Sequence, residues 1–128
     1  MTVDPVEVVI EFLRSAPGLA PGSVTGDHVG HQAGQPMIYV EHSGGFRMVR
    51  DRMDRADIDI SVYHEDRKGA VDLAYLCREA LLEELPGRVV AGAEVLDVEE
   101  ISSPRYEPDS TSRAHMYSGE VALFYTLA

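Results

Sequence analysis

The 128-residue sequence has little of three things: cysteine, basic charge and long apolar runs. A single cysteine, Cys77, excludes an intrachain disulfide and a thiolate zinc cluster, so burial alone must hold the fold. No apolar run reaches the roughly 18–20 residues of a membrane span, and the first residues lack the basic and apolar segments of a signal peptide. We therefore expect a protein made in the cytosol, without membrane association.

Basic charge is scarce relative to acidic charge. Eleven Lys and Arg residues stand against 22 Asp and Glu residues, which gives a formal net charge of −11. Such a chain repels nucleic acid, so binding of DNA by the whole surface is excluded. The hydrophobic share of 45% and the charged share of 26% are those of a globular protein. The length predicts a single domain over residues 1–128.

Motifs that carry catalysis or bind metals are also missing. The sequence contains no GxSxG, GxGxxG or GxxxxGK[ST]. His28 and His31 form HxxH without further ligands at zinc spacing, and His64 lacks the second histidine of HExxH. Cys77 falls on the apolar stripe of a predicted helix, which indicates a buried structural thiol. We expect no enzyme activity, no catalytic residue, no metal and no cofactor.

A helix begins at Pro5, because Asp4 is an N-cap residue and Glu7 completes a capping box. Helical periodicity places Val6, Val9, Ile10 and Leu13 on one stripe. Val8 and Phe12 lie on the opposite side and need a partner of their own, which is either a local loop or another subunit.

The remaining elements follow from periodicity and from glycine and proline. Strands are predicted over 37–42, 56–64 and 89–98, the last irregular at Gly92, and a helix runs from Asp66 to about Leu85. A long closing strand over 115–127 is expected to outrun the core or to bulge near Gly119. Long loops cover 16–36, with a short strand near 23–25, and also 43–55 and 102–113. The order predicts an α+β fold: a mostly antiparallel sheet of about four to five strands with two helices on one face.

The segment 43–55 is the locally basic stretch of this acidic chain. It opens with Gly44–Gly45, a turn signal, and its arginines alternate with two aspartates. Either it is a solvated loop with weak local ion pairs, or it contacts carboxylates, for example Glu94–Glu100 of a second copy. The candidates for a subunit interface are Val8, Phe12, Phe46, Arg47, Arg50, Arg52 and Arg55.

Three segments of the sequence are similar to those of a known family: "GGFRMVRDRMD" from Gly44, the strand-to-helix run Ile58–Leu85, and "SPRY" from Ser103. Together with the order of elements, they resemble the tail terminator, or tail completion, proteins of long-tailed siphovirus-type bacteriophages, especially those of actinobacterial hosts. The resemblance covers nearly the whole chain. It implies a small α/β protein that forms a homohexameric ring on the tail tube, ends tail growth and presents a surface to the head–tail connector. It also implies a place at the head-proximal end of the virion tail, after assembly in the host cytoplasm.

A ring of this kind lets DNA pass through without specific binding, and an acidic lumen would keep the channel from gripping phosphates. The candidates for the lumen or an acidic patch are Asp57, Asp59, Glu94, Asp97, Glu99 and Glu100. Another head–tail connector or minor tail protein is the alternative within this class. From a different class, a small metal- or small-molecule-dependent enzyme would require the fold to bring His28, His31 and His64 together.

Overall fold

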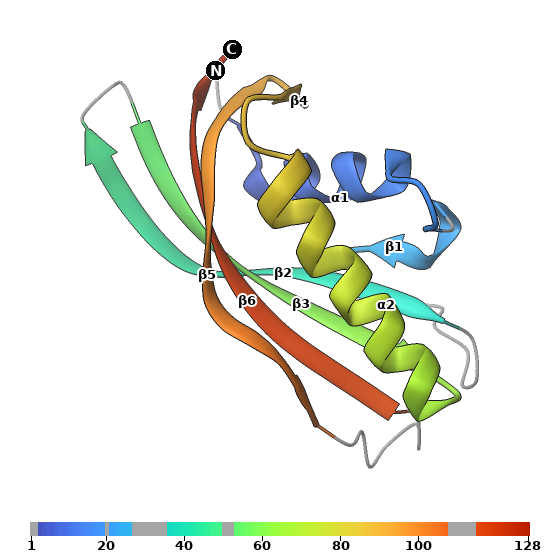
Figure 1. Ribbon diagram of the computed structural model, residues 1–128. Coiled ribbons are helices and arrows are strands. Elements are labelled where there is room, and N and C mark those ends of the chain that lie inside the picture. The colour runs from blue at the N-terminus through green and yellow to red at the C-terminus, as the bar shows by residue number, and fades with distance from the viewer. Residues whose placement is uncertain (1–2, 20, 27–35, 50–52, 108–114) are drawn as a thin grey trace.

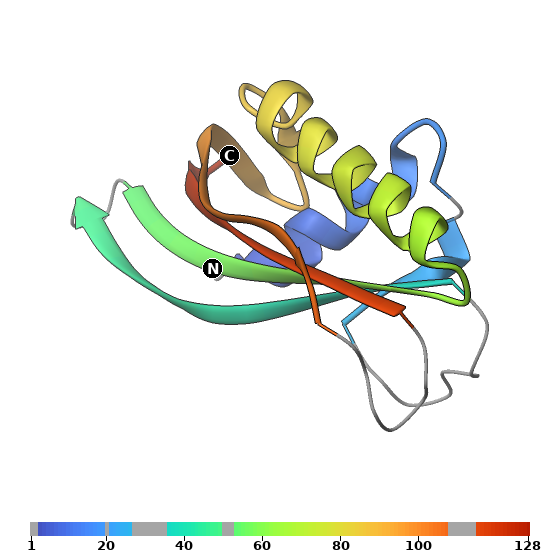
Figure 2. The ribbon, with the colours of Figure 1, turned by 60° about the horizontal axis from the view of Figure 1, so that its bottom comes forward.

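The computed structural model describes residues 3–19, 21–26, 36–49, 53–107 and 115–128. Two helices lie on the concave face of a curled sheet and leave its other face without a helix (Figures 1 and 2). The sheet has six strands in the order β1-β2-β3-β6-β5-β4. The predicted α+β class and the placement of both helices on one face agree with this arrangement. The sheet is mixed because β1 pairs with β2 in parallel, whereas the other pairs are antiparallel.

Both helices begin where the sequence predicted. Helix α1 covers Pro5–Ser15, and the backbone N–H of Val6 donates to Asp4 Oδ1 at 3.0 Å. Helix α2 covers Arg67–Glu79, capped by Asp66, and continues as a π-helical turn over Ala80–Glu84. The side chains that α2 turns toward the sheet, Ala70, Ala74, Cys77 and Leu81, are buried.

The strands differ from the prediction in length and number. Strand β2 spans Met37–Val49 and β3 spans Met53–His64, so most of the predicted 43–55 loop is strand. Gly44–Gly45 lies within β2 and pairs with β3 instead of forming a turn, and the residue before it, Ser43, is the extra residue of a bulge, because the pairing shifts between His42 and Gly44. Gly45 has φ +126°, and a Cβ there would overlap the carbonyl oxygen of Arg55. Only glycine fits this close approach of two strands.

The strand predicted over 89–98 is two strands joined by a turn. Val89–Val90 forms β4 and Ala93–Tyr106 forms β5, and the turn between them is Ala91–Gly92. Both turn residues have positive φ, 49° and 82°, as a two-residue hairpin loop requires. Strand β5 also takes up the first part of the predicted 102–113 loop. The described part of the 16–36 loop holds a 3₁₀ turn at Pro21–Ser23 and strand β1 at Val24–Thr25.

The closing strand β6 spans His115–Leu127, the predicted range. It pairs with β3 without a register shift, so the expected bulge near Gly119 is absent from that ladder. The irregularities lie on its other neighbour, β5, where the register shifts around Leu96, Ile101 and 103–104. A Cβ on Gly119 would lie 3.1 Å from the Ser102 carbonyl oxygen, so the glycine makes room for this bulged part of β5.

Candidate functional site

The helix-free face of the sheet carries most of the predicted functional residues. On β3, Ala56, Ile58, Ile60 and Val62 are buried under the helices, and the residues between them point to the other face. Cross-strand register then assigns neighbours to the same face. Three rows of such neighbours cross the sheet, each in the strand order β2, β3, β6 and β5. The first row is Phe46, Arg55, Phe124 and Asp97, and the second is Gly44, Asp57, Ala122 and Glu99. The third row is Glu41, Asp59, Glu120 and Ser102.

One of these rows places three carboxylates side by side in the middle of the sheet. Asp59 pairs in register with Glu41 on β2 and with Glu120 on β6. Partial burial raises the pKa of the Asp59 carboxyl, and the negative charges of Glu120 and Glu41 raise it further. The hydroxyl of Ser43 donates to Glu120 Oε2 at 2.5 Å and so holds that carboxylate in place. Like charges opposite one another cost stability, so this row does not exist to stabilise the fold.

Five of the six residues proposed for the lumen share this face. Asp57 and Asp59 lie on the central strand β3, and Glu94, Asp97 and Glu99 pair with the outward-facing β6 residues from strand β5. Alternation along β3 was enough to predict the first two. Glu41 and Glu120 were missed, because only strand register reveals that they adjoin Asp59.

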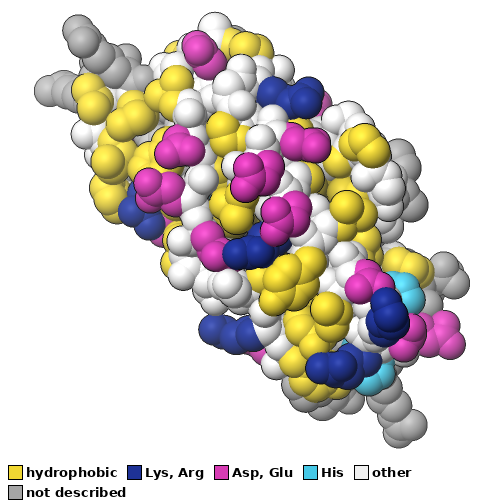
Figure 3. Space-filling view, in the orientation of Figure 1, with side chains coloured by type: hydrophobic (Ala, Val, Ile, Leu, Met, Phe, Trp, Pro, Cys, Tyr) yellow, Lys and Arg dark blue, Asp and Glu magenta, His cyan; other side chains and the backbone are white. Residues whose placement is uncertain are grey.

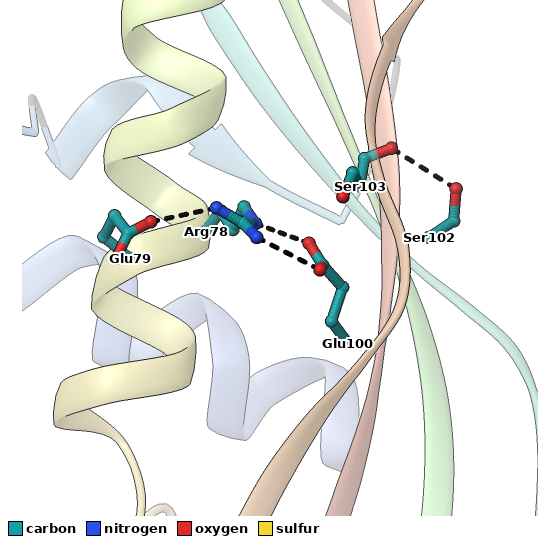
Figure 4. A network of polar contacts seen from close by, with 5 residues as sticks. All are labelled: Arg78, Glu79, Glu100, Ser102 and Ser103. Atoms are coloured by element: carbon teal, nitrogen blue, oxygen red, sulfur yellow. Dashed lines mark hydrogen bonds and ion pairs between the residues drawn. The ribbon is translucent and has the colours of Figure 1, made fainter.

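Glu100 is the exception, and its place in the acidic set is wrong. It lies on the helix side of β5, where the Arg78 guanidinium of α2 donates to both of its carboxylate oxygens (Figure 4). This hydrogen bonding holds the pKa of the Glu100 carboxyl below its usual range. Arg78 also binds Glu79 at 3.0 Å. The three residues form a clasp between α2 and β5, which is a structural role.

The structure describes two of the predicted interface arginines, Arg47 and Arg55, and their surroundings differ. The guanidinium of Arg55 lies between the rings of Phe46 and Phe124, 5.3 and 5.8 Å from their centroids, and pairs with Asp57 at 2.8 Å. Its charge is therefore satisfied within the chain. Arg47 is exposed on β2 and has no ion pair with any residue that the structure describes. Arg50 and Arg52 lie outside the described residues.

Val8 and Phe12 are buried, so the prediction that they contact another subunit is wrong. Helix α1 lies between β1 and β2 on one side and β4 with the π-helical turn on the other. The Arg88 guanidinium covers the ring of Phe12 at 5.8 Å. Both apolar sides of the helix are thus covered by strands and turns of its own chain, rather than by the local loop or the second subunit that the sequence suggested.

Two of the histidines, His64 and His115, and the cysteine make local structural contacts. His64 Nδ1 accepts from the Asp66 backbone N–H at 3.0 Å at the start of α2, and His115 Nδ1 lies 3.0 Å from the Tyr106 hydroxyl. Burial raises the pKa of the Cys77 thiol to about 12. The cavity that Cys77 lines, between α2 and strands β5 and β6, has a volume of about 20 Å³, room for about one water molecule.

Within the described ranges, no group of three or more His, Cys, Asp or Glu residues is placed to hold a metal ion. Among the same residues, no helix has the length and apolarity needed to cross a membrane. His28 and His31, the HxxH pair, lie outside these ranges.

Comparison with known proteins gives a likeness in fold. No family model and no curated protein matches the sequence. Among solved structures, the fold is that of a chain in a structure titled "Virion of native gene transfer agent (GTA) particle". The two share 16% identity and a TM-score of 0.59, over 92% of this chain and 91% of the other. The likeness spans both chains almost from end to end, so it concerns the whole architecture described above.

Proposed function

We propose that this protein is a structural protein of a phage virion, which caps the tail tube as a homohexameric ring. In this role it ends tail growth and forms the tail-side surface for head–tail joining. Its partners are its own copies, the tail tube protein and the head–tail connector protein, and its place is the head-proximal end of the tail, after assembly in the host cytoplasm. Support comes from the end-to-end likeness to a chain of a phage-like virion particle.

The acidic, helix-free face is the observation that carries the proposal. It concentrates Glu41, Asp57, Asp59, Glu99 and Glu120 on a sheet surface that neither described helix covers (Figure 2). A carboxylate surface repels DNA phosphates, and a channel lined by it would let the genome slide without specific binding. We assign Asp57 and Asp59, on the central strand, to the lumen.

A non-enzymatic role accords with the same features. The carboxylates lie on an open sheet surface, whereas an enzyme site of this size would be expected in a concave pocket. The cavity beside Cys77 is too small for a substrate. We propose that the protein acts through shape and assembly alone.

Elongation of tail tubes tests the function. Tube protein of the same phage is allowed to polymerise with and without this protein, and tube lengths are measured by electron microscopy. We expect growth to stop in its presence, with bound protein at one tube end. Binding along the sides of the tubes, or to the connector alone, would instead indicate a minor tail protein or another head–tail connector.

A further inference from the structure

Two exposed apolar patches lie on β2 and β5, on stretches that the short edge strands β1 and β4 leave unpaired on the outer side. On β2, the residues from Glu41 to Val49 are all exposed, and they include Phe46 (57%), Met48 (43%) and Val49 (44%). Figure 3 shows hydrophobic side chains gathered at this end of the β2–β3 hairpin. On β5, Leu96 (45%) and Ile101 (42%) are exposed, as is Tyr106 (42%) at the far end of the strand. We call these stretches the β2 patch (46–49) and the β5 patch (96–101).

Bulges expose three of these side chains. Met48 is the extra residue where the β2–β3 register shifts between Arg47 and Val49. Leu96 and Ile101 are the extra residues where the β5–β6 register shifts, between Val95 and Asp97 and between Glu100 and Ser102. A bulge re-aims a side chain that would otherwise follow the alternation of the strand. Large apolar residues at three such positions indicate contact surfaces.

The two patches have opposite charge. Arg47 stands in the β2 patch, where it lies opposite Asp54 in the β2–β3 register, and it forms no ion pair with a described residue. The β5 patch carries Asp97 and Glu99, both exposed. An apolar surface with an arginine is thus complementary to an apolar surface with carboxylates, which favours correct association and disfavours contact between two identical patches.

The patches also lie at the same level of the sheet. Phe46 pairs with Arg55, Arg55 with Phe124, and Phe124 with Asp97, so one row crosses the sheet from patch to patch. Cyclic symmetry rotates each subunit without raising it, so the two ends of such a row can meet between neighbours. Patches at different levels would favour a helical filament instead.

We propose that the β2 patch of one copy docks on the β5 patch of the next, with Phe46 and Met48 packed against Leu96 and Ile101, and Arg47 facing Asp97 and Glu99. The contact is made by side chains, because bulges and Pro104 blunt the β5 edge against continuous strand pairing. This inference rests on the proposed function, since it specifies the contact that closes the ring.

Disulfide trapping in free solution tests the contact without tail tubes. Met48→Cys and Leu96→Cys variants are mixed and oxidised, and Cys77 stays unreactive because it is buried. We expect mixed disulfide dimers to exceed either homodimer by roughly tenfold. A chain carrying both substitutions should form a ladder of linked oligomers. Equal amounts of mixed and identical dimers, or no ladder, would overturn the head-to-tail contact.

Charged substitutions in the tube assay separate this inference from the proposed function. Phe46→Glu and Leu96→Glu should each weaken ring formation on tubes by roughly tenfold or more. Lys68→Glu, which alters an exposed residue at the start of α2 outside both patches, should leave ring formation unchanged. If all three variants still cap tubes, the function stands and the contact is wrong. If the unmodified protein fails to cap tubes while trapping succeeds, the contact stands and the function is wrong.

Discussion

On strand β3, Ile58 and Ile60 face the helices and are buried, whereas Asp57 and Asp59 face the opposite side and stay partly exposed. The same alternation makes one face of the sheet an apolar core and the other a band of carboxylates. The apolar face supplies the stability of the fold through burial. The acidic face costs stability wherever like charges adjoin. The acidic residues are therefore better explained by the molecules that this surface contacts than by the stability of the fold.

The contrast predicts its largest effect at the core. Ile58→Ala should lower the free energy of unfolding by about 2–5 kcal/mol, because Ile58 is fully buried and its truncation leaves a cavity. The matched change on the other face, Glu99→Ala, should stay within about 0.5 kcal/mol. Urea denaturation followed by circular dichroism measures both. Similar losses for the two variants would break the distinction between the faces.

A second effect arises where β2 leaves the core. Gly45→Ala should destabilise by about 1–3 kcal/mol, because φ is +126° and the new Cβ would overlap the Arg55 carbonyl oxygen. Gly44→Ala is the control, since its Cβ would meet only Asp57 Oδ2 at an ordinary 3.9 Å. Thermal unfolding of the pair should show a clear loss for residue 45 alone. An equal loss at residue 44 would argue against the close approach of Gly45 to β3.

The helix-free face contains one small packed site, and it can be distinguished from its surroundings. Arg55→Ala should cost about 1–2 kcal/mol, because it removes an ion pair and two cation–π contacts. Arg47→Ala, which removes no ring contact and no ion pair with a described residue, should cost about 0.5 kcal/mol or less. Chemical denaturation of the two variants compares them. A neutral Arg55 variant would show that the stack contributes nothing to stability.

The smallest effect concerns pH. The pKa of Asp59 is raised in the folded state, so the folded protein binds more protons than the unfolded chain between the two pKa values. Stability contributed by this group therefore falls as pH rises through that window and is lowest at neutral pH. Asp59→Asn should stabilise the protein by roughly 0.5 kcal/mol at pH 7, with no gain below about pH 4. A constant difference from pH 3 to 7 would contradict the assignment.

The sequence was informative where local rules decide. The cap at Asp4, the helix after Asp66 and the alternation from Ala56 to His64 were all predicted and are confirmed. Gly44–Gly45 misled, because two adjacent glycines, which usually mark a turn, here pair with β3 inside a strand, directly after a bulge at Ser43. Ala91 gave no signal, since alanine rarely adopts the positive φ that turns the chain there.

The candidate site was predictable only in part, for a related reason. Periodicity assigns Asp57 and Asp59 to an outer face, but the row with Glu41 and Glu120 depends on the register of three strands. Glu100 was misassigned because the bulge at Leu96 shifts the alternation along β5, so that Glu100 does not share the face of Glu94. Val8 and Phe12 were misplaced because tertiary packing covers both sides of α1, which no pattern within the helix reveals.

The central claim is that the acidic, helix-free face lines the channel of a ring. Cryo-electron microscopy of tail tubes capped by this protein tests it most directly. We expect a ring whose bore is lined by the strands, with Asp57 and Asp59 facing the channel and both helices on the outside. A bore lined by arginines or by the two helices would contradict the account.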